Sequence, residues 1–246
     1  MTRNRLLPNP AAVALALATS TALHVLPASA GEGAIEINQL CVATGCFAGD
    51  APGWPVQITE PGSYVLTSNL DVPSSSEGVE IQASQVVLDL GGHAIRSGHV
   101  CTGDGPSCSG AAGIRGIGFG IMNFPSSITI RNGSVQGFEF ECMRVSGAGV
   151  VVRDLQVSDC GSHGILHFGQ GLIENTVVRN CGDTGVLGNG LVTVRNSYLL
   201  NNFSYGVQDA NCSGNTLSSN ATNLAIQEEN CANDIDISIC SGAPCP

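Results

Sequence analysis

Short apolar runs of valine, isoleucine and leucine recur along the chain, and each ends at an asparagine, an aspartate or a glycine. The clearest four of these polar residues are Asn132, Asp154, Asn175 and Asn196, at spacings of 22, 21 and 21 residues. A second series, of glycines followed by an apolar residue, keeps the same spacing. A fixed period in this range is typical of stacked supersecondary units, each of which buries its apolar face only against its neighbours.

The repeat extends in both directions and predicts about eight rungs. Asn69 and Gly91 precede the four positions, and Asn215 and Asp234 follow them. The interval of 41 residues between Gly91 and Asn132 is about one period plus an insertion, and we assign the insertion to a protruding loop at 97–116, which is rich in glycine and serine. Valine and isoleucine favour strands, and the residues between the runs favour turns. Each rung therefore predicts two or three short strands.

The period excludes two other repeat or sheet architectures. A leucine-rich repeat needs its own leucine spacing, which is absent, and a sandwich of antiparallel strands would not keep a register of 21–22 residues. The sequence therefore predicts an all-β domain, a single-stranded right-handed parallel β-helix. We expect an internal amide ladder from asparagines at one repeat position, and a second ladder at a neighbouring turn. The first comprises Asn132, Asn175, Asn196 and Asn215, and the second Asp159, Asn180, Asn201 and Asn220.

Three segments, Val86–Ile95, Ile128–Gly133 and Val194–Asn202, resemble the repeats of right-handed β-helix proteins of the pectate-lyase-like superfamily. Ile58–Asn69 is similar to the strand that precedes such helices, and the resemblance covers about residues 56–235. It implies a polysaccharide-binding groove along the side of the coils. Lyases of this superfamily use an arginine or lysine base, often with acidic Ca²⁺ ligands. Because the superfamily also includes hydrolases, epimerases and adhesins, the resemblance specifies the fold much better than the activity.

The N-terminus predicts export. Arg3 and Arg5 precede an apolar run at 11–25, and Ala28 to Ala30 forms a small-residue cleavage site. We expect residues 1–30 to be a signal peptide, 31–55 an N-terminal cap with a disulfide loop, and 56–246 the β-helix with a disulfide-bearing C-terminal end. No later run is long and apolar enough to span a bilayer. The protein is therefore expected to be secreted, to the periplasm or the extracellular space, and to be a monomer.

Charge narrows the choice of partner. All nine basic residues are arginines, and two of them lie in the signal peptide, so the mature chain carries 7 arginines against 20 acidic residues, a formal charge of 7 − 20 = −13. Nucleic acids and anionic membranes would be repelled overall.

All 11 cysteines lie in the mature part, which predicts disulfides in an exported protein. Repeat spacing places two pairs on adjacent rungs, and sequence proximity suggests three local pairs, which leaves Cys142 as a free thiol. The predicted pairs are Cys160–Cys181, Cys212–Cys231, Cys41–Cys46, Cys101–Cys108 and Cys240–Cys245. A zinc site is the alternative, but the cysteines are not clustered in the usual short motifs and histidine is scarce, so we predict no metal centre.

The outward position beside the inward valines reads Arg131, Arg153, Glu174 and Arg195 on successive rungs. Strand alternation should place these side chains above one another on the solvent face. Three guanidinium groups in a line could bind the carboxylates or sulfates of an acidic polysaccharide. The alternative is a surface salt ladder in which Glu174 neutralises its neighbours, and such ladders contribute little free energy.

A neighbouring turn predicts a mixed acidic and basic patch that includes Arg144, His163 and Asp183. His163, in Gly-Ser-His-Gly-Ile, superficially resembles a polygalacturonase element, but the remaining catalytic residues of that family are absent. We therefore interpret His163 as a turn residue and transfer no hydrolase activity.

Two functions remain open from the sequence. One is non-catalytic binding of an extracellular or cell-surface polysaccharide. The other is a small polysaccharide lyase, or a related enzyme, that acts on uronic-acid glycans. No cofactor is expected in the first case, whereas Ca²⁺ would be expected for a lyase.

Overall fold

The computed structural model describes residues 33–102, 107–119, 124–189, 191–220, 222–225 and 235–236. The chain divides into two units, Met1–Gly33 and Ala34–Pro246, and the fold below is that of the second. The predicted signal peptide, the expected rung at Asp234 and the cysteines Cys231, Cys240 and Cys245 lie outside the described residues.

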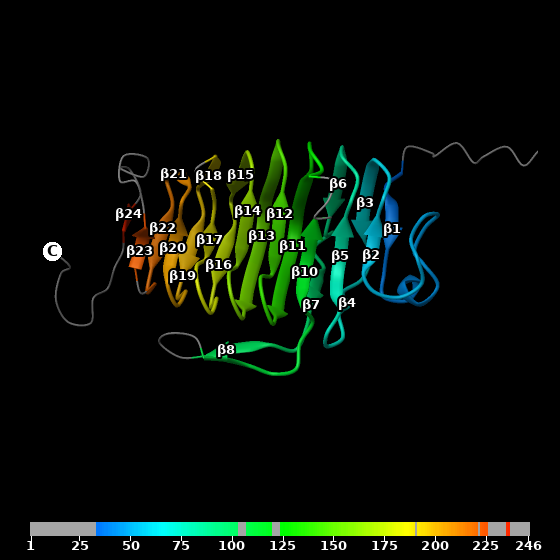
Figure 1. The fold of residues 1–246 in the computed structure, drawn as a ribbon, viewed down its shortest axis with the longest axis horizontal. Helices are drawn as coiled ribbons and strands as arrows, with labels where there is room; N and C mark the ends of the chain where they lie inside the picture. The colour runs from blue at the N-terminus through cyan, green and yellow to red at the C-terminus, as the bar shows by residue number, and fades with distance from the viewer. Residues whose placement is uncertain are drawn as a thin grey trace, which may run out of the picture. The chain divides into compact units, whose positions relative to one another are not determined.

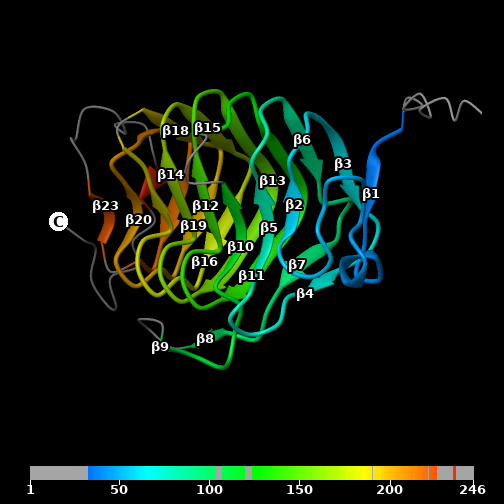
Figure 2. The same ribbon diagram turned by 45° about the vertical axis from the view of Figure 1, so that its right-hand side comes forward.

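Parallel strands wind through successive coils and form two large sheets (Figures 1 and 2). The eight-stranded sheet contains β2 (Val56–Ile58), β5 (Glu77–Ile81), β10 (Arg115–Phe119), β12 (Met143–Ser146), β14 (Ile165–Phe168), β17 (Val186–Leu187), β20 (Tyr205–Gln208) and β23 (Thr222–Ala225). Its eight strands mark eight passes of the chain, with about seven full coils between the first and the last. The all-β parallel β-helix and the approximate number of rungs are thus confirmed.

The fourteen-stranded sheet bends at a corner into two faces. Face 1 contains β1 (Ile35–Ile37), β3 (Gly62–Leu66), β6 (Val86–Asp89), β15 (Gly171–Glu174), β18 (Val192–Arg195) and β21 (Asn211–Ser213). Face 2 contains β4 (Leu70–Asp71), β7 (Ala94–Arg96), β16 (Val177–Arg179), β19 (Tyr198–Leu200), β22 (Thr216–Ser218) and β24 (Ile235–Asp236). Two long strands, β11 (Thr129–Phe138) and β13 (Val150–Cys160), run through the corner and belong to both faces.

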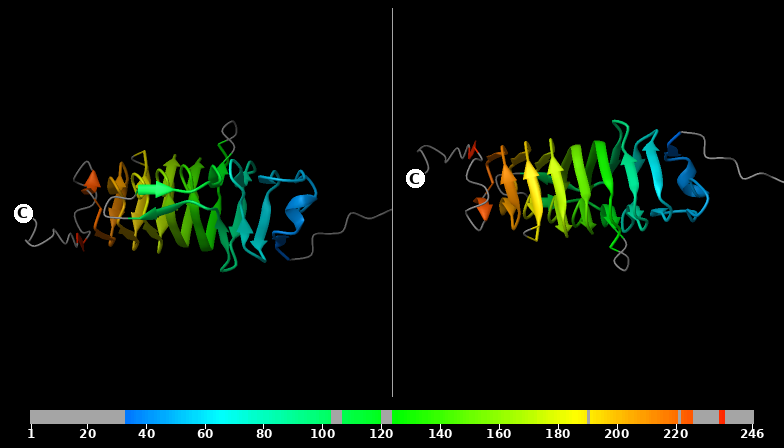
Figure 3. Two further views of the ribbon diagram at one scale, coloured as in Figure 1. Left: turned by 90° about the horizontal axis from the view of Figure 1, so that it is seen from below. Right: turned by 90° about the horizontal axis from the view of Figure 1, so that it is seen from above.

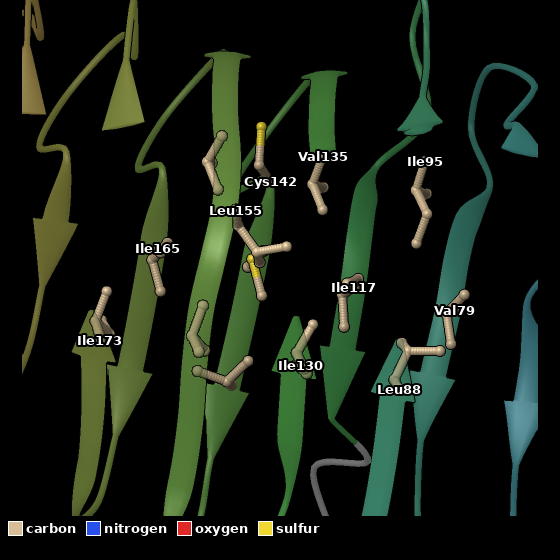
Figure 4. Close-up of a cluster of buried hydrophobic side chains, with 14 of the residues drawn as sticks. Val79, Leu88, Ile95, Ile117, Ile130, Val135, Cys142, Leu155, Ile165 and Ile173 are labelled. Carbon is tan, nitrogen blue, oxygen red and sulfur yellow. The ribbon is translucent and has the colours of Figure 1, made fainter. Parts of the chain in front are cut away.

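Aliphatic side chains from all three walls fill the inside of the coils (Figure 4). On each wall, residues of adjacent coils lie in register, as Val79, Ile117 and Met143 do in the eight-stranded sheet. These side chains are fully buried. Burial of a valine, leucine or isoleucine contributes roughly 1.5–3 kcal/mol, so these rows supply most of the driving force for stacking.

The residues at the corner adopt the left-handed backbone conformation. Asn132, Asp154, Asn175 and Asn196 have φ between 49° and 60°. Asparagine, aspartate and glycine tolerate this region better than other residues, which explains why they recur at this position. All four side chains are exposed. The expectation that Asn132, Asn175 and Asn196 form an internal amide ladder is therefore wrong.

The internal ladder lies one residue later in the chain, at the first residue of face 2. The backbone N–H of Thr176 donates to Ser197 Oγ at 3.2 Å, and the N–H of Ser197 donates to Asn215 Oδ1 at 3.0 Å. All three residues are buried. Asn215 was correctly expected in a ladder because its coil is shorter by three residues, which moves it from the corner position to the inward one.

The second corner follows the same rule at the end of face 2. Asp159, Asn180 and Asn201 have φ between 51° and 57°. The side chains of Asn180 and Asn201 are joined by a hydrogen bond of 2.9 Å. The inward residue again comes next: Asn202 is buried and is hydrogen-bonded to Asn220, the one expected member that lies in the buried ladder.

The disulfides differ from the predicted set in one respect. Cys41–Cys46 and Cys101–Cys108 are present as expected, but Cys160 is bridged to Cys142, with a Cα–Cα distance of 5.3 Å, and Cys181 is a buried free thiol. Cys212 is disulfide-bonded, while its expected partner lies outside the described residues.

Stacking does not favour a bridge between Cys160 and Cys181. In parallel strands that lie in register, the Cα–Cβ bonds at one repeat position point the same way, so the Cβ atoms stay about 4.8 Å apart. A disulfide needs Cβ atoms at ~3.8 Å with converging directions. Cys142 precedes β12 and Cys160 ends β13, so these two reach each other across the inside of a coil. The predicted Cys160–Cys181 bridge and the predicted free Cys142 are both wrong.

The glycine-rich loop at 97–116 carries an antiparallel hairpin of β8 (Val100–Thr102) and β9 (Ser107–Ser109). The hairpin lies across the coils next to the second corner (Figure 3, left), and the N–H of Cys101 donates to Asp159 Oδ1 at 3.3 Å. Gly161 and Gly182 form the surface below it. A Cβ added at Gly161 would lie 3.1 Å from His99 Nε2, and one at Gly182 would lie 3.4 Å from Cys108 Sγ. Both would also collide with backbone carbonyls of the preceding coil.

At the N-terminal end of the described residues, β1 pairs with β3, and the 3-10 helix η1 (Cys41–Ala43) follows it in a segment closed by the Cys41–Cys46 bridge. No helix among the described residues is long and apolar enough to cross a membrane.

Candidate functional site

An open groove of about 510 Å³ runs along the outside of the corner between the two faces of the fourteen-stranded sheet. It repeats from coil to coil, because each coil contributes the corner residue and the two residues after it. Polar side chains dominate its lining, which consists of Gly92, Asn132, Gly133, Ser134, Asp154, Leu155, Gln156, Asn175 and Val177.

The left-handed corner residues create this concavity. At these residues the backbone bends sharply from face 1 to face 2. The exposed side chains at the corner and the outward side chains of face 2 therefore line the same hollow. Ser134, Gln156 and Val177 are the outward residues of face 2, and they are paired in register. The groove therefore offers amide, hydroxyl and carboxylate groups at intervals of one coil.

The predicted arginine line borders this groove on face 1. Arg131 is paired in register with Arg153, Arg153 with Glu174, and Glu174 with Arg195, so the expected alignment of these four side chains is present. Two of the arginines are tied to carboxylates of the neighbouring coil. Arg131 Nε lies 2.9 Å from Asp89, and Arg195 Nη2 lies 2.6 Å from Glu174.

Of the three arginines in the line, Arg153 has the longest ion-pair distance. Its Nη1 lies 3.4 Å from Asp154 Oδ2, a long contact with the next residue in the chain, and its side chain is about one-third exposed. Because Asp154 lines the groove, Arg153 lies at the groove's edge. Each of the three arginines thus has an acidic neighbour, and the line as a whole carries little net charge.

Asp89 begins the line and shows the effect of these contacts. Partial burial would raise the pKa of its carboxyl group, but hydrogen bonds from the Gly91 N–H, Asn132 and Arg131 outweigh it. Its pKa therefore lies below the ordinary value, and Asp89 is ionised at neutral pH.

The other polar surface is the outer side of the eight-stranded sheet. Arg115 lies between Glu77, at 2.5 Å, and Glu141, at 3.2 Å, and all three side chains are largely buried. This cluster was not predicted around Arg115. The in-register pairing of Arg115 with Glu77 depends on the long loop between their strands, so the repeat spacing alone could not reveal it.

Three predicted site residues lie on this same surface. His163 Nδ1 is 3.8 Å from Asp183 Oδ2, whereas Arg144 lies over the ring of Phe168, 5.7 Å from its centroid. The structure thus separates the predicted site residues into two groups. Arg131, Arg153, Glu174 and Arg195 lie beside the corner groove. Arg144 lies on β12 of the eight-stranded sheet, and His163 and Asp183 lie in the turns before β14 and β17.

Two other groups of polar side chains lie outside these surfaces: a cluster of possible metal ligands and a buried histidine. The ligand atoms of His99, Cys101 and Cys108 lie within 4.8 Å of one another, as a metal site requires. The two sulfurs are joined in a disulfide, however, so only the histidine can coordinate. Inside the coils, His167 is fully buried with neither ring nitrogen hydrogen-bonded, and burial lowers its pKa to about 4.

Comparison with known proteins places the chain in a family. A family model described as a right handed beta helix region matches residues 58–222. The chain belongs to this right-handed β-helix family. The match covers the coils from β2 to the start of β23, and therefore both candidate surfaces.

No curated protein matches the chain. A solved structure similar to this β-helix protein is the A-module of mannuronan C-5 epimerase AlgE4 from Azotobacter vinelandii. It is 13% identical, with 76% of this chain and 67% of that chain covered and a TM-score of 0.37. A likeness this distant supports no argument about the site.

Proposed function

We propose that this β-helix protein is secreted and binds an extracellular polysaccharide in the corner groove, without catalysis. The observation that carries the proposal is the groove itself, with one set of hydrogen-bonding side chains per coil. A polysaccharide is a repeating, hydroxyl-rich polymer, and a surface that repeats along one axis can bind several of its units in the same way.

The distance between adjacent coils supports the binding of a polysaccharide along the groove. Adjacent coils are separated by ~4.8 Å, close to the rise of one sugar residue in an extended chain. Consecutive coils can therefore meet consecutive sugars. Ser134, Gln156 and Asn175 each offer groups that can donate and accept hydrogen bonds, which suits hydroxyl groups.

The composition of the groove favours binding over catalysis. Asp154 is the one titratable residue among those that line it. Hydrolysis of a glycosidic bond usually needs two carboxyl groups, one on each side of the bond. Elimination needs a base beside the sugar's acidic proton, and Arg153, at the edge of the groove, is paired with Asp154.

Secretion is supported by the N-terminal sequence pattern and by the three disulfides among the described residues, because such bonds persist in oxidising compartments. N-terminal sequencing of the exported protein should begin at Gly31. An intact Met1 on protein recovered from the medium would contradict this part of the proposal.

A polysaccharide lyase remains a second candidate because of one specific observation on the other surface. His163 and Asp183 are neighbours there, and His163 lies on the coil next to that of Glu141, which binds Arg115. A titratable ring, carboxylates and a guanidinium are therefore present on adjacent coils, and these are the groups that acid–base chemistry uses.

One experiment separates the two candidates. Binding of polygalacturonate, alginate and dextran is measured for the wild-type protein, for Gln156→Ala in the groove and for His163→Ala on the eight-stranded sheet. We expect Gln156→Ala to weaken binding about tenfold, His163→Ala to bind normally, and no ultraviolet-absorbing unsaturated product to form, with or without Ca²⁺. Product that disappears in His163→Ala would establish the lyase instead, and loss of binding only in His163→Ala would move the site to the other surface.

A further inference from the structure

The seven arginines among the described residues differ in whether they form an ion pair with a carboxylate. Five of the seven form ion pairs with Asp or Glu side chains, namely Arg96, Arg115, Arg131, Arg153 and Arg195. Arg144 instead lies over an aromatic ring. Arg179 is exposed and, within the described part of the chain, has no carboxylate at ion-pair distance. Its guanidinium is therefore available to a ligand.

Arg179 lies on face 2, beside the corner groove and on the last coil that lines it. It is the last residue of β16, two positions after Val177, which lines the groove. Residues two apart on a strand point to the same side of a sheet, so Arg179 and Val177 share the outer surface.

An exposed aromatic residue lies next to the groove on the following coil. Tyr198 of β19 is paired in register with Val177, and 53% of its surface is exposed. Tyr198 and Arg179 are thus diagonal neighbours on adjacent parallel strands. Such neighbours are ~7–8 Å apart, within reach of an arginine and an aromatic side chain.

We propose that Tyr198 and Arg179 form a subsite for a sugar residue that carries an anionic group, either a carboxylate or a sulfate. This inference rests on the proposed binding function and names the ligand class for one end of the groove. The apolar C–H face of the sugar ring packs on the Tyr198 ring. The guanidinium of Arg179 donates a pair of hydrogen bonds to the anionic group.

This subsite reconciles an acidic ligand with an acidic protein. The arginine line at the groove's edge is neutralised by Asp89, Asp154 and Glu174, so it attracts a polyanion only weakly. At physiological ionic strength, charges more than ~8–10 Å away are largely screened. A single unpaired guanidinium beside an aromatic ring can therefore select an anionic sugar despite the protein's overall negative charge.

The test compares matched polymers and matched arginines. Affinities for polygalacturonate, for sulfated dextran and for neutral dextran are measured by titration calorimetry at low salt. The variants are Arg179→Gln, Tyr198→Ala and Tyr198→Phe, with Arg195→Gln as the control because Arg195 is exposed but already paired with Glu174. All three positions are on the surface, and thermal melting verifies that each variant is folded.

We expect Arg179→Gln to weaken binding of at least one anionic polymer roughly tenfold and to leave dextran binding unchanged. Tyr198→Ala should weaken all polymers that bind, whereas Tyr198→Phe should keep the affinity, because the ring and not the hydroxyl makes the contact. Preference for polygalacturonate over sulfated dextran, or the reverse, identifies the anionic group.

Three outcomes would overturn the inference. Equal losses in Arg179→Gln and Arg195→Gln would mean that only overall charge matters. Normal binding in Arg179→Gln and Tyr198→Ala, together with weak binding in Gln156→Ala, would remove the subsite and leave the proposed function standing. Failure of the wild-type protein to bind any of the polymers would remove both.

Discussion

Asn202 Oδ1 accepts a hydrogen bond of 3.2 Å from the backbone N–H of Cys181, one coil earlier, and both residues are buried. The Asn202 amide group also donates to the carbonyl of Val178 and, at 2.8 Å, to Asn220 Oδ1. Strand pairing stops at the corner, and the amide replaces the bonds that the backbone loses there. The side chain thus joins three coils.

Replacing Asn202 by leucine should lower the free energy of unfolding by roughly 1–3 kcal/mol, because the buried N–H of Cys181 loses its acceptor. Urea-induced unfolding measures this loss. Asn196→Gly is the matched control: it changes an exposed corner residue whose positive φ glycine also accepts, and its effect should be small. Equal losses in the two variants would contradict the assignment of Asn202 as the inward residue.

The disulfide topology can be read by peptide mapping without reduction. We expect a peptide pair that joins Cys142 to Cys160, and Cys181 as a free thiol that reacts with alkylating reagents only after unfolding, because burial raises its pKa and hides it. Cys181→Ala should leave the bridge intact. Removal of the bridge with Cys142→Ala should cost about 3 kcal/mol, the magnitude expected for a closed loop of this size. A Cys160–Cys181 peptide would contradict the structure.

Because burial lowers the pKa of His167, we expect the protein to lose stability at mildly acidic pH. Its pKa is about 4 in the folded protein and about 6.5 in the unfolded chain, so the unfolded state binds the proton first as the pH falls. Stability should be constant above pH 6.5, fall between pH 6.5 and 4, and lose no more from this group below pH 4. The full effect is about 3 kcal/mol, at 1.36 kcal/mol per pH unit.

The variant His167→Leu should flatten this part of the pH profile. Asp89 acts in a separate window: its lowered pKa stabilises the fold above its ordinary value of 3.8, and that contribution is lost as the pH falls below it. A profile that stays steep between pH 6.5 and 4 in His167→Leu would assign the titration to another group.

Glu174→Gln tests the salt ladder beside the groove. Glu174 binds Arg195 through two hydrogen bonds, to Nε at 2.9 Å and to Nη2 at 2.6 Å. Removing the carboxylate frees this guanidinium, so binding of polygalacturonate should become severalfold tighter and more sensitive to salt. The stability of the protein should change little, because Arg195 is exposed. Unchanged affinity for the polymer would show that face 1 does not contact the ligand.

The sequence predicted the fold correctly because a period of 21–22 residues is a long-range signal. It states which residues lie above one another, and the pairing of Arg153 with Glu174 and of Glu174 with Arg195 follows directly. The period does not state which residue of a corner points inward. The asparagines at the corner recur because of their backbone conformation, whereas the buried ladder uses the next residue, which is a threonine at 176 and a serine at 197.

The same limit explains the errors at the site. The partner of Arg131 is Asp89 of β6, which is adjacent to β11 in the sheet but is 42 residues away in sequence, across the hairpin loop. The spacing of 21–22 residues therefore did not identify it. Tyr198 and Gln156 follow their corner residues by two positions and are outward on face 2. Strand alternation after each corner could have found them, but only once the corner was recognised as a bend with solvent on its outer side.

The left-handed corner also makes the length of the protein adjustable in whole units. Each coil makes one complete turn and contains its own corner residue, inward ladder residue and outward groove residue. Duplication of residues 155–175 would therefore add one complete coil without changing the phase of its neighbours. If the proposed binding in the corner groove is correct, such an insertion should lengthen the bound segment of polymer by one sugar.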